Sequence, residues 1–161
     1  MSTMPDERSY YFDTNALFKY YYQEPGSVEI QRLVSISHPI FISPLTLLEC
    51  YSVLLRYSRQ KKLRSPEVRL IIKRLHKDTG LLNGTPGPFR IVPLPTGIFS
   101  KAESILLEHA GQLSFGANDA LHLAIASLLP DKLVFVTSDR SLKNVCNNIG
   151  LPCYDPQLQP A

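Results

Sequence analysis

The chain has 161 residues, of which 44% are hydrophobic and 19% are charged. This composition is typical of a globular domain that buries a full core, and it excludes a disordered chain. The formal net charge of +3 permits a polyanionic partner without demanding one, so composition alone does not select nucleic acid.

The cysteines indicate the compartment that we expect. Cys50, Cys146 and Cys153 lack the paired spacing of a zinc site, and an odd number argues against a disulfide framework. The first nine residues are polar and predict no signal peptide. The longest apolar run, residues 121–129, is too short to cross a bilayer. We therefore expect a soluble, cytoplasmic protein with reduced thiols and no membrane partner.

The predicted secondary-structure elements alternate along the chain. Runs of aromatic and β-branched residues predict strands at residues 10–12, 40–42, 89–94, 133–137 and 151–154. Apolar residues at helical spacing predict helices at residues 16–22, after 27, at 45–60, after 65, at 96–109, after 118 and after 139. This alternation favours an α/β fold, an α/β/α sandwich with a mainly parallel, five-stranded sheet. Without an internal repeat or a long linker, residues 1–161 are expected to form a single domain.

Several helix starts carry sequence signals. Ser43 and Ser65 each stand before a proline, which is the order expected for an N-cap and the first helical residue, and Ser27 and Thr96 can also cap helices. In the helix at 45–60, Glu49 lies beside the predicted core-facing stripe. That stripe comprises Leu47, Leu48, Tyr51, Leu54 and Leu55.

Residues 10–17, Tyr-Tyr-Phe-Asp-Thr-Asn-Ala-Leu, are the stretch around which we expect the chain to be organised. The aromatic residues predict a short buried strand, and Asp13, Thr14 and Asn15 follow where the strand turns into a helix. Open α/β sheets bind ligands at this edge. Asp13 is therefore a candidate site residue, although Asp13 or Thr14 can equally serve only as an N-cap.

Three further acids occupy comparable places. Glu49 lies in the helix after the second strand, Asp119 begins a late helix, and Asp139 directly follows the strongest strand signal. Because strand-to-helix junctions of a right-handed parallel sheet share one edge, Asp13 and Asp139 should meet there, and Glu49 and Asp119 can reach it. Each acid also has an ordinary explanation, as a solvated side chain, a partner of a helix dipole or a helix cap.

Convergence of four carboxylates requires a counter-charge. Two unit charges about 4 Å apart repel by roughly 4 kcal/mol at an effective dielectric of about 20. An all-oxygen ligand set without a His or Cys cluster suits Mg²⁺ or Mn²⁺, and such ions activate water for attack on a phosphodiester. We therefore expect Asp13, Glu49, Asp119 and Asp139 to bind the metal and to carry catalysis.

Four motifs in this order resemble those of the PIN domain family of metal-dependent nucleases, and in particular the VapC-type toxin ribonucleases. They are Phe12-Asp13-Thr14-Asn15, Leu48-Glu49, residues 118–124 (Asn-Asp-Ala-Leu-His-Leu-Ala) and residues 136–140 (Val-Thr-Ser-Asp-Arg), closed by Gly150-Leu151-Pro152. The resemblance covers residues 10–154, which would be the core of a PIN-like domain.

The resemblance implies an endoribonuclease that is the toxin of a type II toxin-antitoxin pair. It implies RNA as substrate, a small antitoxin protein as partner, a homodimer, and Mg²⁺ or Mn²⁺ held by the four acids. Asn15 and Thr137 match polar positions that support the first acid and the metal-bound water. The chain departs from the shortest toxins in residues 59–88, which are longer and more basic, and in its run of three tyrosines at 20–22.

Other polar and aromatic residues have two readings each. His122, one turn after Asp119, is either a general base or, as we favour, a hydrogen-bonded buried histidine. Arg140 and Lys143 lie just beyond the acidic edge and are candidate phosphate contacts, while the basic faces of residues 56–77 either extend that path or are only solvated. The tyrosines at 20–22 either stack bases or, as we favour, pack against a neighbouring element.

Three alternatives stay open beside the toxin. A PIN-fold scaffold would bind RNA or protein without catalysis, although a scaffold has no use for clustered acids. A PIN nuclease need not be a toxin. A receiver-like phosphotransfer domain also places acids at a strand edge, but it requires a lysine after a late strand, and Lys143 falls inside a predicted helix.

Overall fold

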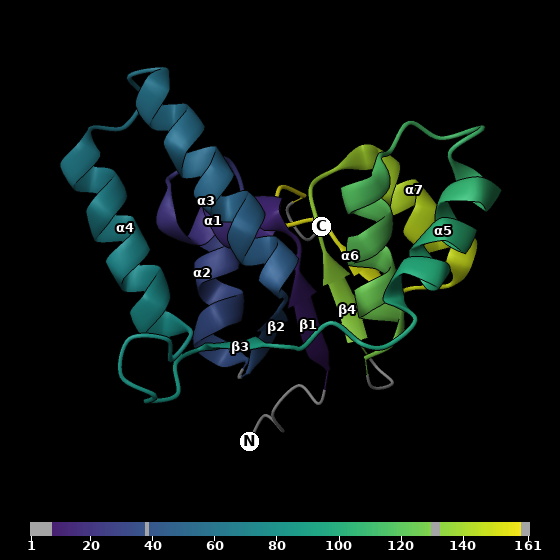
Figure 1. The fold of residues 1–161 in the computed structure, drawn as a ribbon, viewed down its shortest axis with the longest axis horizontal. Helices are drawn as coiled ribbons and strands as arrows, with labels where there is room; N and C mark the ends of the chain where they lie inside the picture. The colour runs from purple at the N-terminus through teal and green to yellow at the C-terminus, as the bar shows by residue number, and fades with distance from the viewer. Residues whose placement is uncertain (1–7, 38, 130–132, 159–161) are drawn as a thin grey trace.

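The computed structural model describes residues 8–37, 39–129 and 133–158, in which five strands and seven helices alternate (Figure 1). The strands are β1 (Ser9–Phe12), β2 (Ile40–Ile42), β3 (Phe89–Ile91), β4 (Leu133–Val136) and β5 (Cys153–Tyr154). The helices are α1 (Thr14–Tyr21), α2 (Ser27–Ile36), α3 (Pro44–Arg59), α4 (Ser65–Asp78), α5 (Ile98–His109), α6 (Ala117–Ser127) and α7 (Arg140–Ile149).

The sheet has the order β3-β2-β1-β4-β5, and every strand pair in it is parallel. The central strand β1 pairs through Tyr11 with Phe41 of β2 and Phe135 of β4. The predicted α/β class and five-stranded parallel sheet are thus confirmed. Strand β3 lies at one edge, as expected from Pro93 just beyond it.

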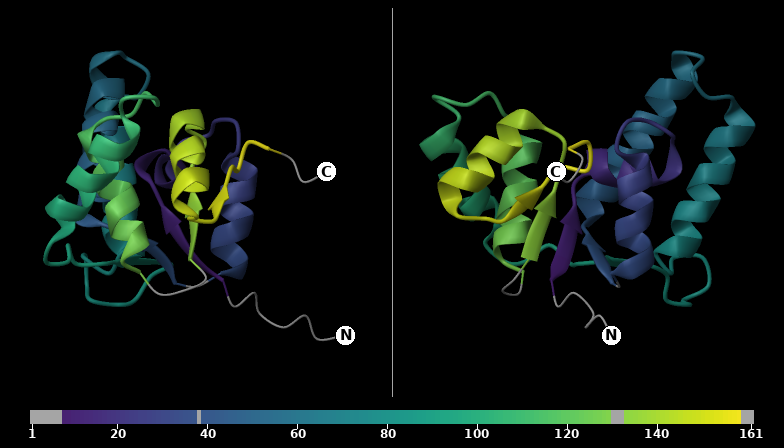
Figure 2. Two further views of the ribbon diagram at one scale, coloured as in Figure 1. Left: turned by 90° about the vertical axis from the view of Figure 1, so that its right-hand side faces the viewer. Right: turned by 180° about the vertical axis from the view of Figure 1, so that it is seen from behind.

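Helices cover both faces of the sheet (Figures 1 and 2). Successive residues of a strand point to opposite faces, so Phe12 belongs to a core shared with α1, α2, α3 and α4, whereas Tyr11 belongs to a core shared with α5, α6 and α7. All four residues of β4 are buried, which explains their unbroken apolar run.

The strand order creates a switch point between β1 and β4. From β1 the chain moves outward through β2 to β3, and it then returns to β4 and moves the other way to β5. In such open sheets a crevice forms outside the carboxyl ends of the two strands at the reversal. Asp13 follows β1 and Thr137 follows β4 at that place.

The start of α3 is as predicted, and three other starts differ. Ser43 and Thr46 form a reciprocal capping box at α3. Ser27 and Ser65, however, are the first residues of α2 and α4 rather than their caps. The residue before α2 is Gly26 with φ 92°, and the residue before α5 is Gly97, not Thr96, with φ 80°. Glycine adopts this left-handed conformation without steric penalty and so turns the chain into the helix.

The predicted apolar stripe of α3 is wrong at two positions. Leu48 is 67% exposed and Leu55 is 51% exposed, while Leu47 and Leu54 are buried. Helix α3 packs on α1, α4 and α6, and Leu48 and Leu55 stay exposed beside these contacts. Leu48 and Leu55 therefore lie on the surface of the protein, next to the buried face of α3.

The tyrosine run packs within the fold, as we favoured. Tyr20 and Tyr21 pack against Phe89, with ring centroids 5.3 and 6.3 Å away. Tyr22 stacks on Phe18. Among the described residues, no helix combines the length and the apolar character that a membrane span requires.

Candidate active site

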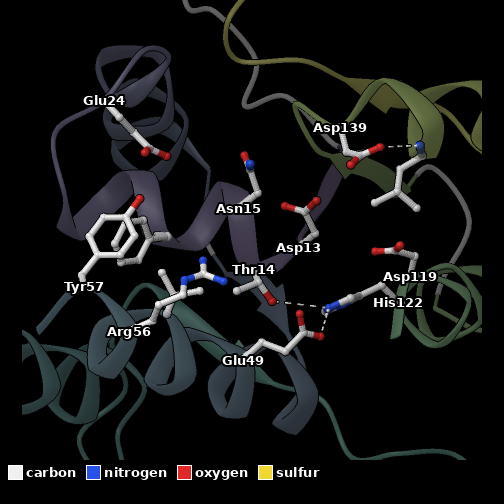
Figure 3. A pocket seen from close by; sticks show the side chains of 13 residues that line it. Asp13, Thr14, Asn15, Glu24, Glu49, Arg56, Tyr57, Asp119, His122 and Asp139 are labelled. Atoms are coloured by element: carbon white, nitrogen blue, oxygen red, sulfur yellow. Dashed lines mark hydrogen bonds and ion pairs between the residues drawn. The ribbon is translucent and has the colours of Figure 1, made fainter. Parts of the chain in front are cut away.

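The carboxyl ends of β1 and β4 open into a cleft of about 340 Å³. All four acids predicted from the sequence line it, although they come from four different helices or their caps (Figure 3). Asp13 lies near the middle, with Glu49 on one wall and Asp119 and Asp139 on the other. The fold thus brings the four acids to one place, as the topology argument expected.

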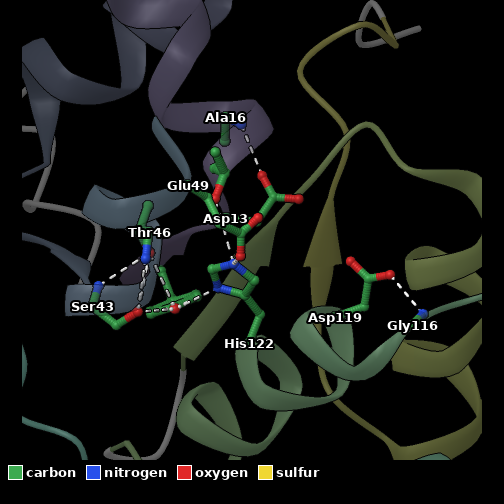
Figure 4. Close-up of polar contacts among 10 residues, drawn as sticks. Asp13, Ala16, Ser43, Thr46, Glu49, Gly116, Asp119 and His122 are labelled. Carbon is green, nitrogen blue, oxygen red and sulfur yellow. Dashed lines mark hydrogen bonds and ion pairs between the residues drawn. The ribbon is translucent and has the colours of Figure 1, made fainter. Parts of the chain in front are cut away.

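Asp13 is the most deeply placed of these acids, with only 4% of its surface exposed. Its Oδ1 accepts a hydrogen bond from the backbone N–H of Ala16 at 2.8 Å, so it is also the N-cap of α1 (Figure 4). The capping interpretation and the site interpretation are therefore both compatible with the structure, because the cap uses one carboxylate oxygen. Among the described residues, no lysine or arginine forms an ion pair with Asp13.

Burial raises the pKa of Asp13 from 3.8 to about 6. Hydrogen bonds from Thr137 and from the Ala16 backbone oppose this shift, as does the charge of His122, and the negative charge of Asp139 adds to it. The fold therefore holds a carboxylate in a place where its charge is poorly compensated. A cation bound beside it would relieve that deficit.

Glu49 is held by a buried network. His122, 2% exposed, donates through Nε2 to Glu49 Oε1 at 3.0 Å, since the carboxylate can only accept (Figure 4). Nδ1 of the same ring lies 2.8 Å from the Tyr11 hydroxyl, which in turn donates to Ser43 Oγ at 3.0 Å. The favoured interpretation of His122 as a hydrogen-bonded buried histidine is confirmed.

Asp119 and Asp139 are more accessible and cap their own helices. Asp119 Oδ2 accepts from the Gly116 N–H at 2.9 Å, which closes the first turn of α6. Asp139 is exposed, and its Oδ1 accepts from the Leu142 N–H at 3.0 Å at the start of α7. Each carboxylate keeps a second oxygen that these bonds do not use.

The donor set suits a hard divalent cation, but the side chains do not yet form a closed ligand shell. In the part of the chain that the structure describes, no three Asp, Glu, His or Cys side chains stand close enough together to hold an ion. The carboxylates are distributed around the cleft walls, and Glu49 is turned toward His122. Oxygen ligands and a buried carboxylate without a basic partner fit Mg²⁺ or Mn²⁺.

The predicted supporting residues lie at the same place. Thr137 is fully buried, its hydroxyl hydrogen-bonds to Asp13, and its Oγ1 accepts from the Asp139 N–H at 3.0 Å. Asn15 is exposed and lines the cleft. Thr137 thus links Asp13 with Asp139, and Asn15 keeps its amide available for a ligand.

The candidate phosphate contacts lie outside the cleft lining. Lys143 pairs with Asp155, a buried carboxylate after β5. Arg140 is exposed at the first turn of α7. Of the two, Arg140 is therefore the side chain that is available for a phosphate.

Sequence reasoning did not assign Glu24, Arg56 and Tyr57 to the site. They line the far end of the cleft, opposite Asp119 (Figure 3). The sequence predicts Arg56 only as one of the basic residues of 56–77, which either extend the phosphate path or are solvated, and no motif marks Glu24. The face that a helical arginine presents cannot be predicted until its partner helices are known.

The family model of the PIN domain matches residues 10–148. No curated protein sequence matched the chain. The match spans most of the chain and includes all four acids, so the chain belongs to the PIN domain family.

Solved structures share the fold at low sequence identity. FitAcB from Neisseria gonorrhoeae is 17% identical with a TM-score of 0.67, covering 93% of this chain and 99% of that one. VapBC2 from Rickettsia felis, bound to a DNA fragment from its promoter, is 16% identical with a TM-score of 0.62, and the match covers 91% of this chain and 98% of that one. VapC20 from Mycobacterium tuberculosis, described as a Sarcin-Ricin loop cleaving toxin, is 14% identical with a TM-score of 0.62, and the match covers 94% of this chain and 99% of that one.

Proposed function

We propose that this protein is a metal-dependent endoribonuclease that cleaves RNA phosphodiester bonds. The observation that carries the proposal is the buried carboxylate of Asp13, which lies without a described basic partner in the same cleft as three other acids. A stable domain gains nothing from an uncompensated buried charge. The placement is understandable if the carboxylate binds a cation in the working protein.

In this proposal Asp13, Glu49 and Asp119 hold Mg²⁺ or Mn²⁺, and Asp139 completes the acidic set. The bound ion supplies an activated water and stabilisation of the leaving oxygen. The protein's part is positioning: Thr137 fixes Asp13, and the pair of His122 and Tyr11 fixes Glu49. Asn15 and Arg140 are proposed to contact the water and a phosphate, and Lys143 would reach a phosphate only by leaving Asp155.

We further propose that the nuclease is the toxin of a type II toxin-antitoxin pair, acting in the cytoplasm as a homodimer. The support is the likeness of fold to structures described as FitAcB, VapBC2 and VapC20. VapC20 is described as a Sarcin-Ricin loop cleaving toxin, and a further structure with this fold, from Klebsiella pneumoniae, is described as a toxin-antitoxin complex. On this proposal a small antitoxin binds the protein and blocks its activity.

The nuclease proposal is tested by RNA cleavage with the purified protein in Mg²⁺, in Mn²⁺ and in chelator. We expect cleavage with either metal, loss of cleavage in chelator, and recovery with excess metal. Asp13→Asn keeps the size and capping ability of the side chain and removes its charge, so cleavage should fall by about 100-fold or more. Glu103→Gln, at an exposed position of α5, is the matched control.

Cleavage that is insensitive to chelator or to Asp13→Asn would contradict the nuclease proposal. Binding of RNA without cleavage in any metal would favour the scaffold instead. The toxin proposal is tested separately: expression should arrest growth, and co-expression of the neighbouring small gene should relieve the arrest. Normal growth with active cleavage in vitro would identify a PIN nuclease that is not a toxin.

A further inference from the structure

The cleft continues beyond the acids into a second region with different chemistry. Asn15, Glu24, Arg56 and Tyr57 line this end, which we call the base subsite, and Phe18 and Val53 supply apolar surface between them. Figure 3 shows Glu24, Tyr57 and Arg56 on the side of Asp13 away from Asp119, with Asn15 between the two groups. A ligand held at the acids would extend into this region.

The carboxylate of Glu24 is fixed in place by an unusual partner. Lys19 is only 2% exposed, and its Nζ donates to Glu24 Oε1 at 2.8 Å. The Glu24 backbone N–H also donates to Ser27 Oγ at 2.9 Å. Lysine is rarely buried unless it is paired, so the fold holds one carboxylate oxygen firmly and leaves the side chain 23% exposed to the cleft. This arrangement presents a rigid hydrogen-bond acceptor.

The other polar groups of the base subsite have unused hydrogen-bonding capacity. In the described part of the chain, neither the guanidinium of Arg56 nor the amide of Asn15 has a hydrogen-bond or ion-pair partner, and the same holds for the Tyr57 hydroxyl. The Tyr57 ring is anchored by edge-on contacts to Phe18 at 5.1 Å and Tyr22 at 5.2 Å. Hydrogen-bond donors and acceptors therefore line one end of the cleft together with the apolar side chains of Phe18 and Val53.

From these observations we infer that the base subsite binds a guanine base next to the scissile phosphate of single-stranded RNA. A carboxylate accepts and never donates, and guanine presents adjacent N1–H and N2–H₂ donors on its Watson–Crick edge. Uracil has one N–H between two carbonyl oxygens, which a carboxylate repels. The guanine O6 would accept from the guanidinium of Arg56, which lines the same end of the cleft. This inference rests on the proposed ribonuclease function and adds a base preference to it.

The charge around the base subsite favours a nucleic acid strand over a peptide. Arg56 lies in the last turn of α3, and the exposed residues Arg59, Lys61 and Lys62 follow it directly. The Lys62 ammonium lies 4.8 Å from the Tyr57 ring centroid. Positive charge thus continues outward from this end of the cleft, as a path for successive phosphates requires.

The first experiment compares cleavage sites in a random-sequence single-stranded RNA. We expect guanine to be enriched at one of the two nucleotides that flank the cut. Glu24→Gln should lower cleavage at these guanine sites by between about five- and a hundredfold, the range for one bidentate base contact, with a smaller effect at other sites. Glu103→Gln changes an exposed acid that does not line the cleft, so it should keep the enrichment.

Glu24→Gln is expected to lower stability, because it leaves Lys19 buried without its charged partner. A second variant therefore tests the base subsite without disturbing that pair. Arg56→Met removes the proposed donor to guanine O6 and leaves the pair of Lys19 and Glu24 intact, so it should lower the guanine enrichment in a folded protein. An absence of base preference in the wild type, or an enrichment unchanged in both variants, would overturn the inference.

A binding experiment separates the base subsite from the catalytic proposal. Guanosine and uridine 5′-monophosphates carry the same phosphate, so a difference in their affinity for the Asp13→Asn protein, measured by NMR titration, reports on the base. We expect at least about fivefold tighter binding of the guanine nucleotide. Equal affinities or no binding would overturn the subsite even if RNA is cleaved. Preferential guanine binding to Asp13→Asn, together with a wild-type protein that cuts no RNA in Mg²⁺ or Mn²⁺, would instead refute the nuclease and keep the subsite.

Discussion

His122 holds the carboxylate of Glu49 by a hydrogen bond of 3.0 Å from Nε2 to Oε1. The two residues lie 73 positions apart in sequence and belong to α6 and α3. The other ring nitrogen faces the Tyr11 hydroxyl of β1. Three elements are thereby joined at the point where a candidate metal ligand enters the cleft, so the orientation of Glu49 depends on residues behind it.

Tyr11→Phe tests this dependence. The change keeps the ring that stacks on Phe135 at 5.6 Å and removes only the hydroxyl. Because Ser43 and His122 each lose a buried partner, the free energy of unfolding in urea should fall by about 1–3 kcal/mol. RNA cleavage should fall by about 10- to 100-fold, as for other residues that orient metal ligands.

Tyr51 provides a matched control, since its hydroxyl lies 2.9 Å from Nε2 of His76 outside the cleft. Tyr51→Phe removes the same kind of tyrosine–histidine bond from a half-buried position and should leave cleavage unchanged. Equal losses of cleavage in Tyr11→Phe and Tyr51→Phe would show that the Tyr11 effect is not specific to Glu49.

The sheet could be predicted from sequence because each strand is marked by residue type and each junction by polar residues. The unbroken apolar run of β4 and the aromatic run before Asp13 are typical of buried strands and favour no other kind of element. The exposed faces could not be predicted in the same way. Leu48 and Leu55 have helical spacing with the buried leucines of α3, and the positions of α1, α4 and α6 decide which face is covered.

The positions of Asp13 and Asp139 were predictable because topology brings the ends of parallel strands together, and Glu49 and Asp119 because each lies near the start of a helix that reaches this edge. Their hydrogen bonds were not. That His122 points to Glu49 depends on the rotation of two helices, and that Lys19 is buried against Glu24 depends on the turn before α2. Such contacts follow from packing, which a single sequence does not encode in any local pattern.

The raised pKa of Asp13 predicts a pH dependence of stability in metal-free protein. Between about pH 4 and 6 the folded protein keeps a proton on Asp13 that the unfolded chain releases. Stability therefore falls as pH rises through this window and is level above it, with a change of roughly 3 kcal/mol at most. Asp13→Asn lacks this titration, so it should be more stable than wild type at pH 8 and equal to it below pH 4.

The measurement is urea unfolding of both proteins in chelator across this pH range. The difference between them isolates Asp13, because the other carboxylates titrate in both. A wild-type protein that matches or exceeds Asp13→Asn in stability at pH 8 would show that the Asp13 charge is compensated within the fold.

Metal binding should stabilise the wild type and not Asp13→Asn. A cation that binds only the folded protein adds about 2.7 kcal/mol to the free energy of unfolding at a concentration of about 100 times Kd. Thermal unfolding with Mg²⁺, with Mn²⁺ and in chelator measures this gain. Glu103→Gln should gain as much as wild type, and an equal gain in Asp13→Asn would place the ion elsewhere.

Cys153 should be the reactive thiol of the folded protein. A hydrogen bond from Cys146 and the charge of Lys143 lower the pKa of Cys153 below the usual value of a thiol, against the effects of burial and of Asp155. Burial raises the pKa of Cys50 to about 12. Alkylation by iodoacetamide, followed by mass spectrometry, should therefore modify Cys153 first, and its rate should rise at a lower pH than that of an ordinary thiol. Earlier modification of Cys50 would contradict this assignment.

Asp139 allows its capping role to be separated from its charge. Its Oδ1 accepts from the Leu142 N–H, so Asp139→Ala removes the N-cap of α7 and should lower the free energy of unfolding by about 1 kcal/mol. Asparagine caps as well as aspartate does, so Asp139→Asn should keep stability and lose only the charge. If Asp139 completes the acidic set, both variants lose RNA cleavage to a similar extent although only one loses stability. If Asp139→Asn cleaves RNA as well as wild type and only the less stable Asp139→Ala loses activity, the role of Asp139 is the helix cap alone.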